Sequence, residues 1–255
     1  MSETSSDKSF FDKSRRPFLL RKLHSLTGVV PVGGYLVFHL WENSLALQGQ
    51  ERFDEMVKGI DHLPYLWLLE GLILVPLAFH AIYGVVLALE SKPNVHKYTF
   101  SRNWMYTLQR VTGLIAFAFI LYHLYELWFQ RVSGKLAPDQ FYTTLCANMS
   151  STVGPVPVVA LVYIIGIAAS VFHFANGLWG FCFSWGITVS RRAQQAAATV
   201  FGIVGLVVFL LGANTAIYFA TGARFALPGS LFGASPAKSG VRSCADLTYT
   251  QTVAQ

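Results

Sequence analysis

The stretch VVALVYIIGIAASVFHFANGLWGFCFSW, residues 158–185, decides which kind of fold this chain adopts. It contains no Asp, Glu, Lys or Arg, and it exceeds the about 20 residues that a helix needs to cross the hydrocarbon layer of a membrane. One histidine, His173, lies in its second half. Because an imidazole in a bilayer core costs free energy unless a partner binds it, this histidine marks a candidate functional site.

The whole chain has the composition of an integral membrane protein. Of its 255 residues, 53% are hydrophobic and only 13% are charged, which is far too apolar for a soluble domain of this size. We expect an all-α bundle of five transmembrane helices, near residues 23–41, 64–89, 104–129, 158–185 and 196–220. Residues 15–221 would form this membrane domain, after a disordered cytoplasmic N-terminus (1–14) and before an extracytoplasmic tail (222–255). The polar loop after the first helix, residues 43–63, suits either a short amphipathic helix or a solvated connector.

Charge sets the expected orientation. Lys and Arg cluster before the first segment, between the second and third, and between the fourth and fifth. By the positive-inside rule these connections, and with them the N-terminus, face the cytoplasm. The net charge of +6 is therefore a topology signal, and nucleic-acid binding is not expected, because it would need a soluble basic face.

Four histidines on four of the segments occur in a repeated pattern. HLWE at 39–42 matches HLYE at 123–126, and FH at 79–80 followed by Gly84 matches FH at 172–173 followed by Gly177. Leu26-Thr27-Gly28 and Val111-Thr112-Gly113 precede the first and third histidines by similar spacings. Repeats that supply equivalent ligands at a shared interface are a recurrent way to build sites in membrane proteins.

The depth of each histidine predicts how the four would pair. At about 1.5 Å per residue, His39 and His123 lie roughly 27–28 Å from the cytoplasmic ends of their helices, and His80 and His173 roughly 15–18 Å. Two histidines at one level can bind a haem iron from opposite sides. We therefore expect two haems b as cofactors, an inner one held by His80 with His173 and an outer one held by His39 with His123. In the competing interpretation these side chains only hydrogen-bond across helices, which the match of all four in motif and depth disfavours.

Cysteine usage limits the type of haem. The chain has three cysteines and no C-x-x-C-H motif, so covalent c-type attachment is excluded. Their spacing suggests neither a zinc site nor an iron–sulfur cluster.

Three strings resemble the five-helix, dihaem cytochrome b558-type anchor subunits of succinate dehydrogenases and fumarate reductases. They are RKLHSL at 21–26, FSRNW at 100–104 leading into LQRVTG at 108–113, and FHFANGLW at 172–179 followed by WGITV at 185–189. The resemblance implies that the four histidines are the haem ligands and that menaquinone or another quinone is the substrate. It also implies that four residues lie beside the propionates of the inner haem, namely His24, Ser25, Arg110 and Ser184. For His24, an interfacial residue without a ligand is an equally good interpretation.

The resemblance also implies the partners and the location. A flavoprotein subunit and an iron–sulfur subunit would dock on the cytoplasmic face and interconvert succinate and fumarate. The chain would span the cytoplasmic (inner) membrane of a prokaryote, in contact with lipid, as the quinone-reactive subunit; whether the complex forms a higher oligomer is left open. Dicarboxylate catalysis is not expected in this chain, which has no dinucleotide fingerprint and no soluble domain.

Glu70 is the candidate for proton exchange with quinone. It lies ten residues outward of His80, roughly 15 Å higher by helical rise, and therefore near the outer haem. A carboxylate on a membrane-embedded helix is a functional-site hypothesis by default. Glu42 and Glu126, each three residues beyond an outer ligand, are expected to mark the headgroup boundary. In some fumarate reductases of this family a glutamate, thought to relay protons, stands two residues before the fourth ligand; here that position is Val171, so no such relay is expected.

Two alternatives remain open at this point. One is a cytochrome b anchor of another respiratory dehydrogenase, a hydrogenase or a formate dehydrogenase, which also uses intramembrane histidine pairs. The other is a haem-free transporter whose histidines relay protons.

Overall fold

The computed structural model describes residues 17–91, 95, 99–223 and 244. The regular secondary structure of these residues is helical, with one isolated bridge between Val153 and Val156 in a connection between helices. Five helices are long and apolar enough to cross a membrane, which confirms the predicted class and number: Pro17–Gln48, Leu66–Glu90, Ser101–Val132, Val158–Ser184 and Arg191–Thr221. The predicted N-terminal segment 1–14 and all of the tail beyond residue 223 except Cys244 lie outside the described residues.

The first span departs from α-helical geometry twice. Residues 17–27 are α-helical, the π-helix η1 follows at Gly28–Gly33, and α2 covers Gly34–Asn43 before the 3-10 helix η2 at Ser44–Gln48. Pro31 lies inside η1. Because proline has no N–H to donate to the carbonyl four residues earlier, a local departure from α geometry at this point is expected.

The other spans are more regular. The second is α4 (Leu66–Glu90), and the third consists of α5 (Ser101–His123), the π-helix η3 (Leu124–Phe129) and the short α6 (Gln130–Val132). The fourth and fifth are α8 (Val158–Ser184) and α9 (Arg191–Thr221). Ser190 caps α9 by accepting a hydrogen bond from the amide of Ala193 at 3.1 Å, and Gly222 ends it in the left-handed conformation, at φ 73°.

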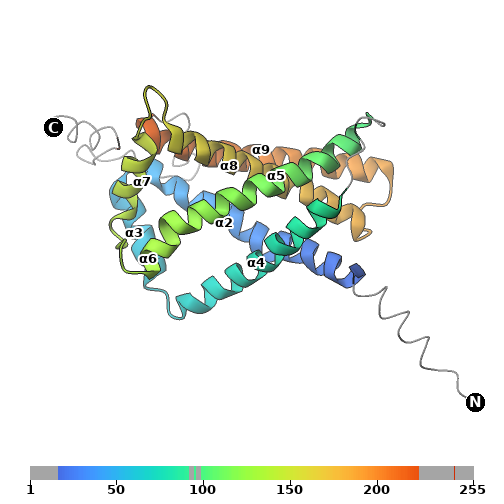
Figure 1. Cartoon of the computed structure of the whole chain (residues 1–255), viewed down its shortest axis with the longest axis horizontal. Helices are drawn as coiled ribbons and strands as arrows, with labels where there is room; N and C mark the ends of the chain where they lie inside the picture. The colour runs from blue at the N-terminus through green and yellow to red at the C-terminus, as the bar shows by residue number, and fades with distance from the viewer. Residues whose placement is uncertain (1–16, 92–94, 96–98, 224–243, 245–255) are drawn as a thin grey trace, which may run out of the picture.

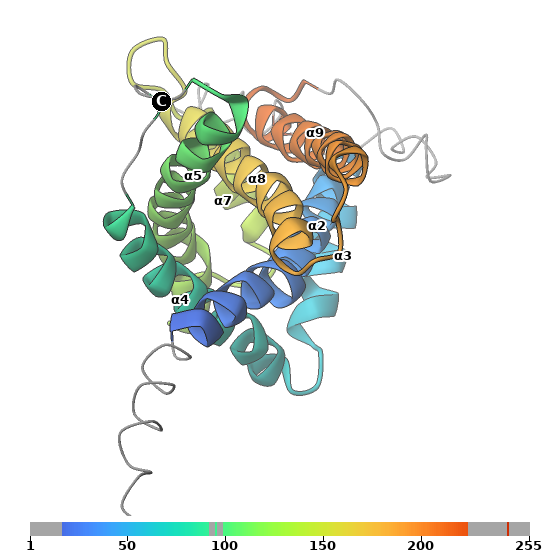
Figure 2. The same ribbon diagram turned by 90° about the vertical axis from the view of Figure 1, so that its right-hand side faces the viewer.

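Four of the spans surround a central space. Seen along the bundle, the first span, α4, α5 and α8 form a ring, and α9 lies outside it against α8 and α2 (Figure 2). The connection between α8 and α9 and the beginnings of α5 and of the first span lie at one end of the bundle, here called the basic end (Figure 1). The opposite end, here called the cap end, carries α3 (Gln50–Asp61) and α7 (Phe141–Ser150).

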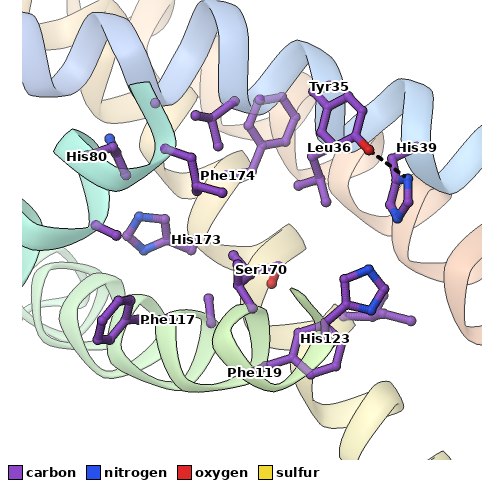
Figure 3. A pocket seen from close by; sticks show the side chains of 18 of the residues that line it. Tyr35, Leu36, His39, His80, Phe117, Phe119, His123, Ser170, His173 and Phe174 are labelled. Atoms are coloured by element: carbon purple, nitrogen blue, oxygen red, sulfur yellow. Dashed lines mark hydrogen bonds between the residues drawn. The ribbon is translucent and has the colours of Figure 1, made fainter. Parts of the chain in front are cut away.

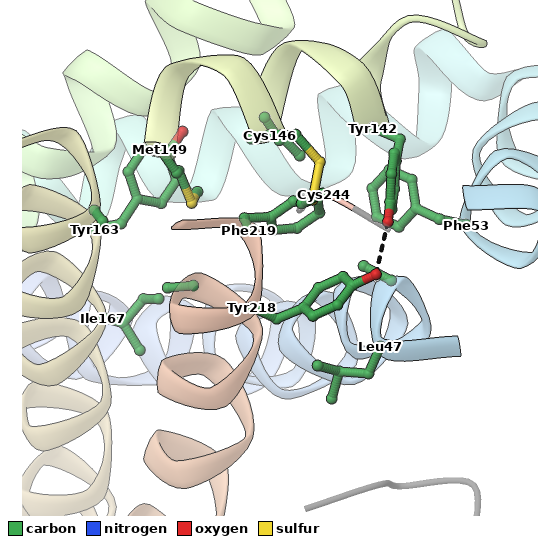
Figure 4. Close-up of a cluster of buried hydrophobic side chains, with 14 of the residues drawn as sticks. Leu47, Phe53, Tyr142, Cys146, Met149, Tyr163, Ile167, Tyr218, Phe219 and Cys244 are labelled. Atoms are coloured by element: carbon green, nitrogen blue, oxygen red, sulfur yellow. Dashed lines mark hydrogen bonds between the residues drawn. A yellow bond between two sulfur atoms is a disulfide. The ribbon is translucent and has the colours of Figure 1, made fainter. Parts of the chain in front are cut away.

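The cap end holds the most tightly packed part of the described core. The open question about the loop after the first span is answered by α3, an amphipathic helix whose Phe53 is 2% exposed. Phe53 packs against Tyr142 of α7 and Phe219 of α9, and the hydroxyls of Tyr142 and Tyr218 lie 2.7 Å apart (Figure 4).

A disulfide joins this cap to the C-terminal tail. It links Cys146 of α7 to Cys244, and both residues are about 1% exposed (Figure 4). The sequence analysis did not foresee this pairing, because the two cysteines are 98 residues apart and occur in no recognisable spacing.

Candidate functional site

A cavity of about 1140 Å³ occupies the centre of the four-span ring. It exceeds the roughly 300–1,000 Å³ that is usual for one drug-sized ligand. Its walls are mostly apolar, and five histidines reach it from the four spans: His24, His39, His80, His123 and His173. All four residues predicted as iron ligands therefore line one cavity.

Two of these histidines face each other in the half of the cavity nearer the basic end. The ring centres of His80 and His173 are 6.0 Å apart, and the rings are inclined at 83°. Two imidazoles that bind one metal from opposite sides have ring centres about 6 Å apart, because each metal–nitrogen bond is about 2 Å. The spacing of this pair suits a metal atom between the rings.

The backbone orients both rings of this inner pair. Nδ1 of His80 lies 2.9 Å from the carbonyl oxygen of His24, and Nδ1 of His173 lies 2.9 Å from that of Gln109. A carbonyl can only accept, so each Nδ1 carries the hydrogen and each Nε2 keeps its lone pair. Metal-binding histidines are commonly fixed in this way by a carbonyl acceptor.

Two glycines make room for the same rings. A Cβ on Gly28 would overlap the His80 ring, and a Cβ on Gly113 would lie 2.9 Å from Cε1 of His173. Each glycine lies four positions, about one helical turn, after the residue whose carbonyl accepts from the histidine ring. Gly28 follows His24 in this way, and Gly113 follows Gln109. The Thr-Gly repeat found in the sequence therefore has a structural role that the sequence analysis did not identify.

The second pair lies at the other end of the cavity. The ring centres of His39 and His123 are 5.7 Å apart, with the rings inclined at 74°. His39 lies near the end of α2 and His123 is the last residue of α5, so both are close to the cap end. Figure 3 shows the two pairs at opposite ends of the cavity, with Ser170 and Phe174 between them.

The π-turn in the first span explains how His39 and His123 come to face each other. His39 lies eleven positions after Gly28, whereas His123 lies ten positions after Gly113. An α-helix turns about 100° per residue, so the extra residue would otherwise point His39 away from its partner. A π-turn takes up one additional residue, and η1 lies between Gly28 and His39.

Side chains, not carbonyls, hold the rings of the outer pair. Nδ1 of His39 lies 3.0 Å from Oε1 of Glu42, and Nδ1 of His123 lies 3.3 Å from the hydroxyl of Tyr163. The Tyr163 hydroxyl donates to Oε2 of Glu126 at 2.7 Å. Glu42, which is expected at the headgroup boundary, has its side chain buried against a histidine of the cavity, and the residue is 6% exposed.

The polar groups that line the cavity also suit a haem, because several of them are buried and have no hydrogen-bond partner. Five buried polar atoms of its lining residues have no hydrogen-bond partner, in the side chains of His24, Glu42, Arg110, Trp128 and Ser170. The described residues contain no group of three or more His, Cys, Asp or Glu side chains that could hold a bare metal ion. Two opposed imidazoles are the set that a haem needs, because the macrocycle supplies its own four nitrogens.

The four predicted propionate neighbours all line the cavity. The Ser25 hydroxyl donates to the carbonyl of Lys22 at 2.9 Å and accepts from Nε1 of Trp185 at 3.0 Å. Nζ of Lys22 donates to the backbone carbonyl of Ser184 at 2.5 Å. His24 stacks on His80 with ring centres 4.1 Å apart, so the structure places it against one of the candidate ligands.

The guanidinium of Arg110 is the remaining predicted propionate neighbour. Its Nη1 donates to the carbonyl of Tyr106 at 2.7 Å, while its Nε is buried without a partner. A positively charged donor that is only partly used suits a carboxylate such as a haem propionate.

Glu70, the predicted proton-exchange residue, lines the cavity and forms an ion pair with Arg131. The same guanidinium donates to Oδ1 of Asp61 at 2.9 Å. Arg131 therefore joins a carboxylate of α4 to one at the end of α3, beside the outer histidine pair. The sequence analysis missed Arg131 and Asp61, because the first appears in sequence as the charged end of a span and the second as part of a polar loop.

Fold and site together define a class of protein, a membrane-spanning helical bundle with two pairs of facing histidines in its core. A family model described as "Succinate dehydrogenase/Fumarate reductase transmembrane subunit" matches residues 90–213. The chain is also 37% identical over 205 residues to the succinate dehydrogenase cytochrome b558 subunit of Bacillus subtilis (strain 168), covering 80% of this chain and 98% of that protein. No solved structure was found to match.

The chain belongs to the succinate dehydrogenase/fumarate reductase transmembrane subunit family. The resemblance noted from its sequence motifs is confirmed. The two alternatives, an anchor of another respiratory dehydrogenase and a haem-free transporter, have no support in these comparisons.

Proposed function

We propose that this chain is the membrane-anchor cytochrome b of a succinate:quinone oxidoreductase, and that it carries electrons through two haems b. The observation that supports two haems is the presence of two facing histidine pairs in one cavity, with ring centres 6.0 Å and 5.7 Å apart. His80 with His173 would hold the inner haem, and His39 with His123 the outer one. A bound haem supplies reversible one-electron reduction.

The residues of the chain orient the ligands and exclude water. The carbonyls of His24 and Gln109 fix the inner imidazoles with Nε2 toward the cavity, and the apolar walls keep the site dry. Arg110, with its partly unused donors, would bind a propionate of the inner haem.

Quinone would bind at the cap end of the cavity, beside Glu70. Reduction of a quinone to a quinol takes up two protons as well as two electrons, so the site needs a group that exchanges protons. Glu70 can accept and donate a proton, and Arg131 and Asp61 would position it and connect it to the surface. Menaquinone is the substrate that the family resemblance implies, although any quinone with the same reacting oxygens could use this group.

The basic end would face the cytoplasm and bind the flavoprotein and iron–sulfur subunits that interconvert succinate and fumarate. The name of the Bacillus subtilis relative supports membership of such a complex. Arg21, Lys22, Arg102 and Arg191 lie at this end, as the positive-inside rule requires of a cytoplasmic face. The disulfide at the cap end supports the same orientation, because disulfides persist in oxidising compartments. The membrane would be the cytoplasmic membrane of a prokaryote.

A reduced-minus-oxidised spectrum of the purified complex tests the proposal. We expect a b-type spectrum with about two haems per anchor chain, resolved into two components by redox titration. His80→Ala and His173→Ala should remove one component, and His39→Ala and His123→Ala the other. Loss of the same component from the His80 and His39 variants would contradict the pairing, and absence of haem from the wild-type complex would contradict the function.

A further inference from the structure

The two histidine pairs differ in what accepts their Nδ1 hydrogens. In the inner pair both acceptors are neutral backbone carbonyls, of His24 and Gln109. In the outer pair both hydrogen-bond chains end at a carboxylate, Glu42 for His39 and Glu126 for His123. The repeat carries the two glutamates at the same position, three residues beyond His39 and His123.

On the His39 side the carboxylate makes the contact directly. Oε1 of Glu42 lies 3.0 Å from Nδ1, and the Glu42 side chain is 8% exposed. Tyr35 and Asn43 also approach the same nitrogen, each at 3.3 Å, but the glutamate oxygen is the nearest atom. The other oxygen of Glu42 is buried and has no hydrogen-bond partner, so the charge of the group is little compensated by other contacts.

On the His123 side a tyrosine connects the histidine to the carboxylate. The Tyr163 hydroxyl donates to Oε2 of Glu126 at 2.7 Å, so its oxygen is left to accept from Nδ1 of His123 at 3.3 Å. Asn148 donates to the other oxygen of Glu126 at 2.8 Å, and Tyr163 is 5% exposed. The chain from imidazole to carboxylate is therefore held in place at both ends.

We infer that Glu42, and Tyr163 with Glu126, are positioning residues that lower the reduction potential of the outer haem. A carboxylate acceptor makes an imidazole a stronger electron donor to its metal, which favours the more positively charged ferric state. A buried negative charge close to the iron acts in the same direction through space. The inference rests on the proposed ligation by His39 and His123, and it adds which side chains set the potential of the outer haem.

Redox titration of the intact complex, followed at the haem absorption, tests the inference. The outer component is identified as the one that His39→Ala removes. In Glu42→Gln the ferric-to-ferrous ratio of that component at a fixed potential should fall about tenfold. For a one-electron couple this equals a rise of about 59 mV in the reduction potential of the haem. Tyr163→Phe and Glu126→Gln should change the ratio in the same direction, and the inner component should stay as in the wild type.

Two controls separate the charge from a general disturbance of the fold. Glu51→Gln removes an exposed carboxylate of the same cap and should leave both potentials unchanged, because water and salt screen that group. Glu42→Asp keeps the charge and should shift the outer potential less than Glu42→Gln.

The possible failures are distinguishable. If the wild type binds both haems and neither Glu42→Gln nor Tyr163→Phe raises the outer potential, the inference is wrong while the proposed function stands. A shift confined to the inner component, or a larger shift in Glu42→Asp than in Glu42→Gln, also overturns it. A wild-type complex without haem contradicts the proposed function itself.

Discussion

At the scale of single residues, Gly28 and Gly113 decide whether the inner histidines can turn into the cavity. Each lies against the ring of a histidine from the neighbouring span, and each occupies the same place in the repeat. Glycine is common in membrane helices for close helix packing, and that general explanation would have assigned these two no particular role.

We predict that Gly28→Ala removes the inner haem component. The added Cβ would overlap the His80 ring, so the ring must leave the position that its Nδ1 bond defines. The haem-to-protein ratio should fall from about two toward about one, measured by reduced-minus-oxidised spectra. Gly34→Ala is the matched control on the same span, because a Cβ there meets nothing within 4 Å. Equal haem content in the two variants would show that the glycine is not required.

Glu70 is the residue on which quinone turnover should depend. We predict that Glu70→Gln lowers quinone turnover about a hundredfold while both haem components remain, because general acid–base catalysis commonly contributes that much. Glu70 forms an ion pair with Arg131 and is not one of the proposed iron ligands, so the haem spectrum reports independently on folding. Steady-state quinone reduction with the assembled complex measures the effect, and unchanged turnover would remove Glu70 from the site.

At the scale of elements, the π-turn at Gly28–Gly33 reconciles two repeats of unequal length. It keeps His80 fitted against Gly28 at one end of the span and His39 turned toward His123 at the other. Pro31 and the one-residue difference in spacing were both visible in the sequence, but either could have indicated a kink instead.

We predict that deletion of Pro31 leaves both haem components in place. In the shortened span His39 would lie ten positions after Gly28, the spacing that a regular helix provides from Gly113 to His123. Deletion of Leu114 from α5 is the matched control, since there is no surplus residue there and His123 would turn by about 100°. That variant should lose the outer component. Loss of the outer component from the Pro31 deletion as well would show that the π-turn is needed for more than register.

At the scale of the whole molecule, the bundle has one end made of basic connections and another end closed by a packed cap. Helices α3 and α7 and the Cys146–Cys244 disulfide form that cap beside the outer histidine pair and Glu70. The same asymmetry separates the two proposed tasks, electron exchange with soluble subunits at the basic end and quinone chemistry beneath the cap.

The disulfide should contribute to the stability of this cap. It joins residues 98 apart, and a bridge that closes so long a loop typically contributes about 2–5 kcal/mol to the free energy of unfolding. We predict that Cys146→Ser and Cys244→Ser lower the thermal midpoint of the purified complex equally, and that a reductant lowers the wild type to the same value. Cys182→Ser, which removes the free cysteine among the described residues, should leave the midpoint unchanged. Different midpoints for the two single variants would show that the effect is not due to the bond.

The same cysteines report the orientation. In the double variant Cys182→Ser/Cys244→Ser, which leaves Cys146 as the thiol among the described residues, Cys146 should react with a membrane-impermeant maleimide only when the extracytoplasmic face is accessible and the cap has been loosened by mild denaturant. Labelling from the cytoplasmic side alone would reverse the proposed topology.

The sequence by itself determined the class, the spans and the four histidines. Apolar segments long enough to cross a bilayer leave the backbone no alternative to helix, and a ligand motif repeated on successive helices gives its depth directly from the helical rise. Those features depend only on local composition and spacing, and the sequence motifs were also specific enough to indicate the family.

What only the tertiary structure decided is which groups contact one another across helices. The carbonyls that hold His80 and His173, the Tyr163 hydroxyl between His123 and Glu126, the Arg131 bridge to Glu70 and the Cys146–Cys244 bond each join residues from different elements. No local pattern encodes such contacts, because the rotation of each helix about its axis is set by packing against its neighbours. The burial of Glu42 is the clearest example, since its place three residues beyond a ligand suited the membrane boundary as well as it suited the core.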